Sequence, residues 1–187
     1  MGNDVGVVVA LEAEARALLP RKLRPGMIED LDGVSVHLCG MGMPAAAAAA
    51  QGLVEHGVTA LAIYGVAGGL DPELTPGTLL CPREVLDDGG ARYPADAAWR
   101  RRLASRLGNL VLRDAPLLTV HEPLLDPSSK AAARRDFKAA AVDMESAAVA
   151  EVARDCGLPF LALRAIADSA QDSIPAPLAG AIDRWGR

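Results

Sequence analysis

The sequence has few aromatic residues and few cysteines. Aromatic residues make up 3% of the chain, which removes the stacking platforms that bind single-stranded nucleic acid. The three cysteines, Cys39, Cys81 and Cys156, lie far apart and form no C-x-x-C pair. Neither a disulfide framework nor a zinc cage is therefore predicted, and a reducing, cytoplasmic location is expected.

Long apolar runs and an excess of positive charge are also missing. The longest apolar stretch, residues 60–70, contains three glycines and is shorter than the ~20 residues of a membrane span. No integral membrane span is predicted. Lys and Arg number 19 against 24 Asp and Glu, a net charge of −5, and the basic residues form no stripe. Nucleic acid is therefore not a predicted partner.

The chain does contain a regular alternation of strand and helix patterns. Its 187 residues, 51% of them hydrophobic, predict a single domain over 1–187 with one core. Strands are predicted at 5–10, 34–39, 60–64, 77–81, 117–120 and 160–167, and helices at 12–19, 44–55, 94–107, 128–135 and 142–156. This order predicts an α/β three-layer sandwich, with a mainly parallel, twisted sheet covered by helices on both faces.

Ligands of such sheets bind beyond the carboxyl ends of the strands. Candidate segments follow the predicted strands or begin a helix: 12–14 (EAE), 40–42 (GMG), 65–69 (GVAGG), 143–145 (DME) and 167–169 (ADS). We expect the chemistry of the protein to lie among them.

Residues 40–45 (GMGMPA) match G-x-G-x-x-A between a strand and a helix, as in dinucleotide-binding sites. Such a site also needs an acid after the following strand to hold the ribose, and residues 60–65 offer none. A tight turn with close helix packing is the favoured interpretation. A helix N-terminus can accept an anion in either case.

Each acid, taken alone, has an ordinary structural explanation. Glu14 lies in a first helical turn, where the helix dipole favours it, Asp168 resembles a turn or cap acid, and Glu145 resembles any helix residue. Arg164, inside the last strand, needs a carboxylate partner if it is buried. The three histidines are isolated, so no metal site is predicted.

The acids and glycines occur together in one order along the chain. Residues 5–14 (VGVVVALEAE), 40–42, 65–70 (GVAGGL), 142–146 (VDMES) and 164–168 (RAIAD) resemble the nucleoside phosphorylase family, most closely its methylthioadenosine/S-adenosylhomocysteine nucleosidase branch. The chain also looks like the hopanoid-associated phosphorylases of that family. The resemblance implies a nucleoside phosphorylase-type fold and cleavage of a purine N-ribosyl bond with release of adenine.

Cofactors and metals are not implied. The implied partners are a small-molecule nucleoside, with phosphate or water as the nucleophile, and further copies of the chain in a homodimer or larger homo-oligomer.

The resemblance also implies roles for individual residues. Glu14 would orient the attacking water, Asp168 would protonate purine N7, and Glu145 would hold the ribose 2′- and 3′-hydroxyls. The implied binding residues are Met144 against the ribose, backbone at Gly42, Val66 and Gly68 near the nucleophile and sugar, and Leu124 and Phe160 in the adenine pocket. Cleavage builds positive charge on the ribose and negative charge on the purine, so an acid at the base and carboxylates near the sugar suit it.

Three departures from the family pattern bear on this interpretation. Val66 stands where the nucleosidases have serine, residues 83–116 are shorter than in the family, and the C-terminal helix is expected to be short or missing. With the covering loop shortened, segments rich in Leu and Ala at 95–107 and 116–125 are expected to leave the ribose 5′ side open to an apolar substituent, such as that of an adenosylhopane. The alternative is that these leucines belong to the core.

Two alternatives stay open. One is a non-catalytic or redox Rossmann-like module that binds a nucleotide at residues 40–45. The other is a catalytically inactive relative that serves only as a subunit.

Overall fold

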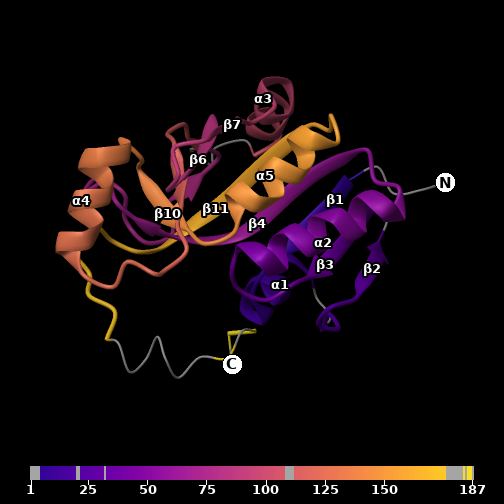
Figure 1. Cartoon of the computed structure of the whole chain (residues 1–187), viewed down its shortest axis with the longest axis horizontal. Coiled ribbons are helices and arrows are strands. Elements are labelled where there is room, and N and C mark those ends of the chain that lie inside the picture. The colour runs from indigo at the N-terminus through magenta and orange to yellow at the C-terminus, as the bar shows by residue number, and fades with distance from the viewer. Residues whose placement is uncertain are drawn as a thin grey trace.

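The structure is a computed structural model that describes residues 5–19, 22–31, 33–107, 112–175, 183, 185 and 186. The strands and helices form the layers shown in Figure 1. Residues 176–182, where a C-terminal helix is predicted to be short or missing, lie outside the described residues.

A mixed, mainly parallel sheet forms the centre of the molecule. Its strands run in the order β2 (Ile28–Leu31), β3 (Val34–Leu38), β1 (Val5–Val9), β4 (Ala60–Gly69), β10 (Ala141–Asp143), β9 (Leu117–Thr119), β6 (Glu84–Asp87) and β7 (Arg92–Pro94). β11 (Phe160–Asp168) also pairs with β4 in parallel, and β5 (Leu79–Leu80) joins β11 to β8 (Leu112–Arg113). The predicted α/β sandwich is confirmed, with antiparallel pairs at β2, β5, β7 and β10.

Helices cover both faces of the sheet (Figure 1). Side chains alternate along β1, so Val8 and Val9 point to opposite faces. Val8 packs in a core cluster with alanines of α2 (Met43–His56) and α5 (Ser146–Asp155). Val9 packs in another cluster with Ala15 of α1 (Glu12–Leu18).

The two remaining helices lie toward the edges. α3 (Ala97–Arg106) has no buried residue, which fits the predicted surface helix, and α4 (Pro127–Phe137) buries one residue, Lys130.

The structure differs from the predicted elements at two places near the ligand edge. The predicted helix at 142–156 is a short strand, β10, followed by a turn and then α5. Val142 pairs with Gly68 of β4 and with Leu118 of β9, and these tertiary partners override the helical pattern. The predicted break at 65–69 is also wrong, because β4 continues to Gly69.

The glycines of β4 allow close packing at its end. A Cβ at Gly69 would lie 2.9 Å from the backbone oxygen of Asp168, closer than real contacts allow. The absent side chains therefore let β11 approach β4 where the two strands end together.

In the described part of the chain, no helix is both long and apolar enough to cross a membrane. All three cysteines are free thiols, with Cys39 and Cys81 buried.

Candidate active site

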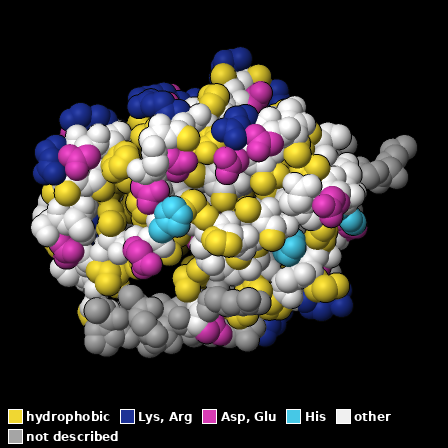
Figure 2. Space-filling model, viewed as in Figure 1, with side chains coloured by type: hydrophobic (Ala, Val, Ile, Leu, Met, Phe, Trp, Pro, Cys, Tyr) yellow, Lys and Arg dark blue, Asp and Glu magenta, His cyan; other side chains and the backbone are white. Residues whose placement is uncertain are grey.

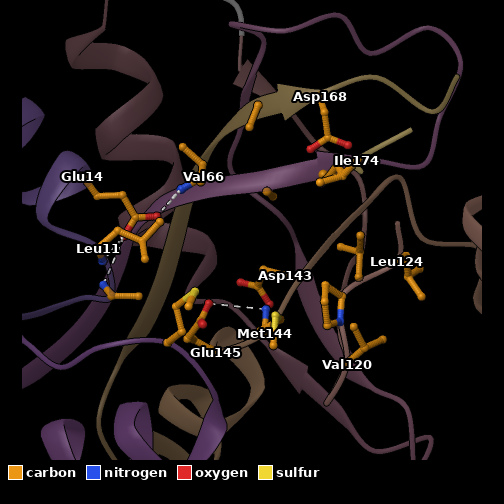
Figure 3. Close-up of a pocket in the computed structure, with 17 residues that line it drawn as sticks. Leu11, Glu14, Val66, Val120, Leu124, Asp143, Met144, Glu145, Asp168 and Ile174 are labelled. Atoms are coloured by element: carbon orange, nitrogen blue, oxygen red, sulfur yellow. Dashed lines mark hydrogen bonds between the residues drawn. The ribbon is translucent and has the colours of Figure 1, made fainter. Parts of the chain in front are cut away.

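A single pocket collects most of the predicted site segments at the ends of β1, β4, β10 and β11 (Figure 3). Its cavity volume is about 170 Å³, and it is open to solvent on one side. The lining residues are mostly apolar, with four acids among them: Ala10, Leu11, Glu14, Met41, Val66, Ala67, Gly68, Val120, Pro123, Leu124, Val142, Asp143, Met144, Glu145, Ala167, Asp168 and Ile174.

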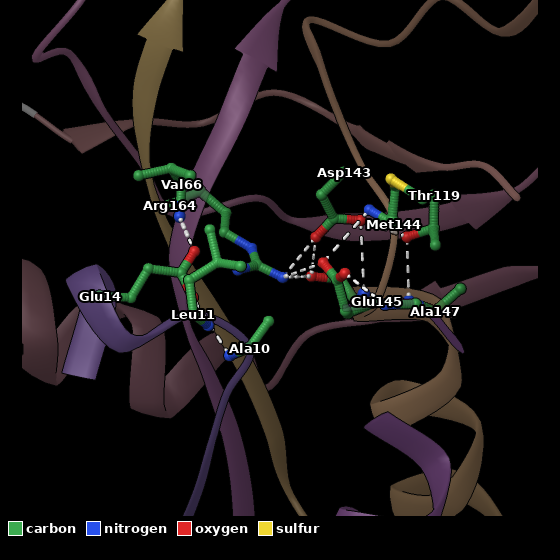
Figure 4. A network of polar contacts seen from close by, with 12 residues as sticks. Ala10, Leu11, Glu14, Val66, Thr119, Asp143, Met144, Glu145, Ala147 and Arg164 are labelled. Atoms are coloured by element: carbon green, nitrogen blue, oxygen red, sulfur yellow. Dashed lines mark hydrogen bonds and ion pairs between the residues drawn. The ribbon is translucent and has the colours of Figure 1, made fainter. Parts of the chain in front are cut away.

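Glu14 is held as a carboxylate by three backbone N–H groups. Its Oε2 accepts hydrogen bonds from the N–H groups of Ala10, at 3.1 Å, and Leu11, at 2.9 Å. Its Oε1 accepts from the N–H of Val66 at 2.7 Å, which ties the start of α1 to β4. Backbone donors therefore hold both oxygens of the Glu14 side chain in place (Figure 4).

The neighbour of Val66 must be glycine for this arrangement. A Cβ at Gly65 would lie 2.2 Å from Oε1 of Glu14 and 2.5 Å from Nη1 of Arg164. Any other residue at position 65 would displace the Glu14 carboxylate from the Val66 N–H.

Glu145 lies at the N-terminus of α5 and points back toward α2. Its Oε1 accepts a hydrogen bond from the N–H of Gly42 at 2.8 Å. Burial, together with the nearby charge of Asp143, raises the pKa of Glu145 to about 7, although Arg164 opposes the shift. Because the Gly42 N–H is engaged by Glu145, it is not free to hold a pyrophosphate, which argues against the Rossmann-like alternative.

Arg164 is fully buried and pairs with a buried carboxylate, as the sequence predicts. Its Nη2 lies 2.6 Å from Oδ2 of Asp143 and 3.8 Å from Oε2 of Glu145. Although burial opposes its charge, Asp143, Glu14 and Glu145 raise the pKa of Arg164. Thr119 and Ser146 donate hydroxyl hydrogen bonds to Asp143. The guanidinium therefore joins the carboxylates of Asp143 and Glu145 in one network (Figure 4).

Asp168 ends β11 and lies across the pocket from Glu14 in the view of Figure 3. Its side chain is 21% exposed and accepts a hydrogen bond on Oδ2 from the ammonium of Lys130. A Cβ at Gly68 would lie 3.4 Å from both carboxylate oxygens of Asp168, so the acid lies directly beside this glycine of β4.

The architecture and the sequence both match known proteins. Residues 4–184 match the sequence profile of the phosphorylase superfamily. The chain belongs to this superfamily. It is 32% identical, over 75% of this chain and 69% of the relative, to 5′-methylthioadenosine/S-adenosylhomocysteine nucleosidase of Geobacillus kaustophilus.

Solved structures of the superfamily share the fold. The nucleosidase of the same name from Neisseria meningitidis, in complex with methylthio-immucillin-A, has a TM-score of 0.79 at 23% identity, covering 90% of this chain and 87% of that one. Futalosine hydrolase of Helicobacter pylori has a TM-score of 0.79 at 20% identity, covering 91% of this chain and 87% of that one.

Most of the residues singled out by the superfamily resemblance line the one pocket. Glu14, Val66, Gly68, Leu124, Met144, Glu145 and Asp168 all do so. Gly42 is not a lining residue and contributes through its bond to Glu145.

The placement of Phe160 in the adenine pocket is wrong. Phe160 begins β11, whereas Asp168 ends it, and the phenyl ring is buried in the core beside a different hollow that Tyr93 lines. In a parallel strand of this length the two ends are on the order of 25 Å apart.

Arg16 of α1 is exposed, pairs with Glu12 at 3.2 Å and does not line the pocket. Among the described residues that line the pocket, none is Lys or Arg. Nor does the described part of the chain contain a cluster of three or more His, Cys, Asp or Glu that could bind a metal ion.

Lys130, which binds Asp168 from outside the pocket, is a residue that the sequence did not indicate. It lies on α4 among other basic residues, and the pattern there is that of an ordinary solvated helix face. Nothing in the local sequence separates this buried lysine from the partly exposed arginines that follow it.

Proposed function

We propose that the protein is a purine nucleosidase that hydrolyses the N-ribosyl bond of an adenosine-type nucleoside and releases adenine. The observation that carries the proposal is the meeting of Glu14, Glu145 and Asp168, from three separate elements, around one largely apolar pocket. The nucleosidase relative supports the same reaction class.

In this proposal the acids have different roles in the reaction. As the bond between ribose C1′ and purine N9 breaks, its electron pair goes to the purine, and Asp168 gives its proton to N7. Glu14 takes a proton from the attacking water, whose oxygen forms the new bond to C1′. The two acids then exchange protons with solvent, so the reaction balances as nucleoside plus water giving ribose and adenine.

Water rather than phosphate is the proposed nucleophile. The acids in the pocket repel a phosphate dianion, and no Lys or Arg is among the described residues that line it. Val66 supplies no hydroxyl group, and its N–H is already bound to Glu14.

The proposed substrate carries an apolar group at its 5′ carbon. Apart from Leu124, which the resemblance assigns to adenine, Val120, Pro123 and Ile174 give the pocket apolar surface for this group. The helix at 97–106 does not contribute to this apolar surface, contrary to the expectation from sequence, because α3 is a surface helix outside the pocket. A methylthio group is a small apolar 5′ substituent that fits this proposal. The hopane group of an adenosylhopane is a much longer one.

A panel of 5′-substituted adenosines tests the proposal. We expect adenine release without phosphate, no ribose 1-phosphate when phosphate is added, and higher kcat/KM for apolar 5′ groups than for adenosine itself. Liquid chromatography of the products measures all three. Strict dependence on phosphate would refute hydrolysis, and activity confined to small polar 5′ groups would refute the apolar preference.

Glu145 is expected to select ribose over deoxyribose. A carboxylate that accepts hydrogen bonds from two vicinal hydroxyls forms charge-assisted contacts of about 1.5–3 kcal/mol each. Loss of the 2′-hydroxyl should therefore lower kcat/KM roughly 10- to 100-fold. Comparison of adenosine with 2′-deoxyadenosine, in the native protein and in Glu145→Gln, measures this. Equal rates for the two sugars in the native protein would contradict the role.

A further inference from the structure

Lys130 is a buried cation next to the site. Its side chain is 1% exposed, and in the described part of the chain only Arg164 is comparably buried among the basic residues. Burial of an ammonium group is costly unless the group is paired and hydrogen-bonded. Its partners therefore indicate why this cation is inside the protein.

All three N–H donors of the Lys130 ammonium go to one short segment. They bind Oδ2 of Asp168, the backbone oxygen of Ser169 at 2.8 Å and the backbone oxygen of Asp172 at 3.0 Å. An ammonium group has three N–H donors, so each of them has an acceptor in this segment. Lys130 thus connects α4 to the end of β11 and to the turn that follows.

The two oxygens of Asp168 are treated differently. Oδ2 is bound by Lys130, whereas Oδ1 accepts no hydrogen bond from the described residues. Asp168 lines the pocket and is partly exposed there. One oxygen is therefore anchored on the protein side, and the other is available to a bound base.

We propose that Lys130 is the positioning residue for the proton donor Asp168. Its ammonium fixes the orientation of the carboxyl group and neutralises the carboxylate that remains after the proton has moved to purine N7. In that step the O–H bond of Asp168 breaks, the N7–H bond forms, and the electron pair of the C1′–N9 bond goes to the purine. Lys130 keeps its own protons throughout. This inference rests on the proposed function.

Four variants test the role: Lys130→Met, Lys130→Arg, Asp168→Asn and the double variant of Lys130→Met with Asp168→Asn. For adenine release from methylthioadenosine, Lys130→Met should lower kcat roughly 10- to 100-fold, as when the residues that orient metal-binding side chains are replaced, and change KM far less. Lys130→Arg should recover part of the loss, because a guanidinium also donates to a carboxylate. The double variant should be no slower than Asp168→Asn alone, since Lys130 acts through Asp168.

A purely structural lysine gives a different pattern. Its removal would either leave kcat unchanged while the thermal unfolding midpoint falls, or lower kcat by the same factor in the Asp168→Asn background as in the native protein. Either result would overturn the role. Lys138→Met, an exposed lysine at the end of α4, is the matched control and should keep native activity.

A failure to fold, a failure of the positioning role and a failure of the proposed function give different results. If Lys130→Met does not fold, Lys130→Gln takes its place: its amide still donates but carries no charge, so kcat should fall while KM changes far less. A native protein that releases adenine while the Lys130 variants keep its kcat refutes the positioning role alone. A native protein that cleaves no nucleoside refutes the proposed function as well.

Discussion

Asp168→Asn is expected to lower kcat for adenine release by at least the ~10²–10⁴-fold that general acid catalysis contributes. Purine is a poor leaving group without protonation at N7, and the amide of asparagine is not an acid at neutral pH. The asparagine oxygen can still accept the Lys130 hydrogen bond, so the turn after β11 should keep its shape. Single-turnover and steady-state rates with methylthioadenosine measure the loss.

Asp172→Asn is the matched control for this variant. Asp172 is an exposed acid in the turn after β11, and its Oδ2 accepts a hydrogen bond from the N–H of Ser169 at 2.7 Å. An asparagine oxygen can replace that bond, so activity should stay near native. A native rate in Asp168→Asn would contradict the role of Asp168 as the proton donor. A loss of kcat in Asp172→Asn equal to that in Asp168→Asn would contradict it as well.

Glu14→Gln is expected to cause the second large loss, again of the order of 10²–10⁴-fold in kcat, because an amide cannot take a proton from water. The structure adds a further effect. Three backbone N–H groups converge on the Glu14 carboxylate, and the NH₂ group of glutamine must face at least one of them. An unsatisfied donor costs about 1–3 kcal/mol, so a lower thermal unfolding midpoint should accompany the loss of turnover.

A measurement of substrate affinity distinguishes the loss of the catalytic base from general damage to the site. Isothermal titration with methylthioadenosine should show retained affinity in Glu14→Gln. Glu12→Gln, two residues earlier on the same helix, is the control, because Glu12 is buried but pairs with Arg16 and lies outside the pocket. Turnover by Glu14→Gln at the native rate would be incompatible with its proposed role as the base.

The position of most site residues follows from the strand pattern. Runs such as 5–9 (VGVVV) and 160–163 (FLAL) are recognisable as buried strands, because β-branched and aliphatic residues suit positions covered on both faces. Once strands and helices alternate, the rule that ligands bind at carboxyl ends brings Glu14 and Asp168 to one edge. The pocket at this edge agrees with that prediction.

The failures occur where long-range contacts decide the structure. Phe160 shares a strand with Asp168, but nine residues of extended chain place the two at opposite ends of the sheet. Val142 has a helical pattern locally, yet pairs with β4 and β9. Short strands of three or four residues such as β6 and β7 carry too little periodicity to be predicted.

The sequence by itself determined the alternation of strands and helices, the edge of the sheet where the acids gather, and the need of the buried Arg164 for a carboxylate. Periodicity and the cost of burying charge are local properties, so they can be inferred without coordinates. The tertiary structure alone decided that the Val66 N–H binds Glu14, that the Gly42 N–H binds Glu145, and that Lys130 binds Asp168. These contacts join residues from separate elements and span 38 to 103 positions along the chain. Only the packing of those elements brings the donors to the acids.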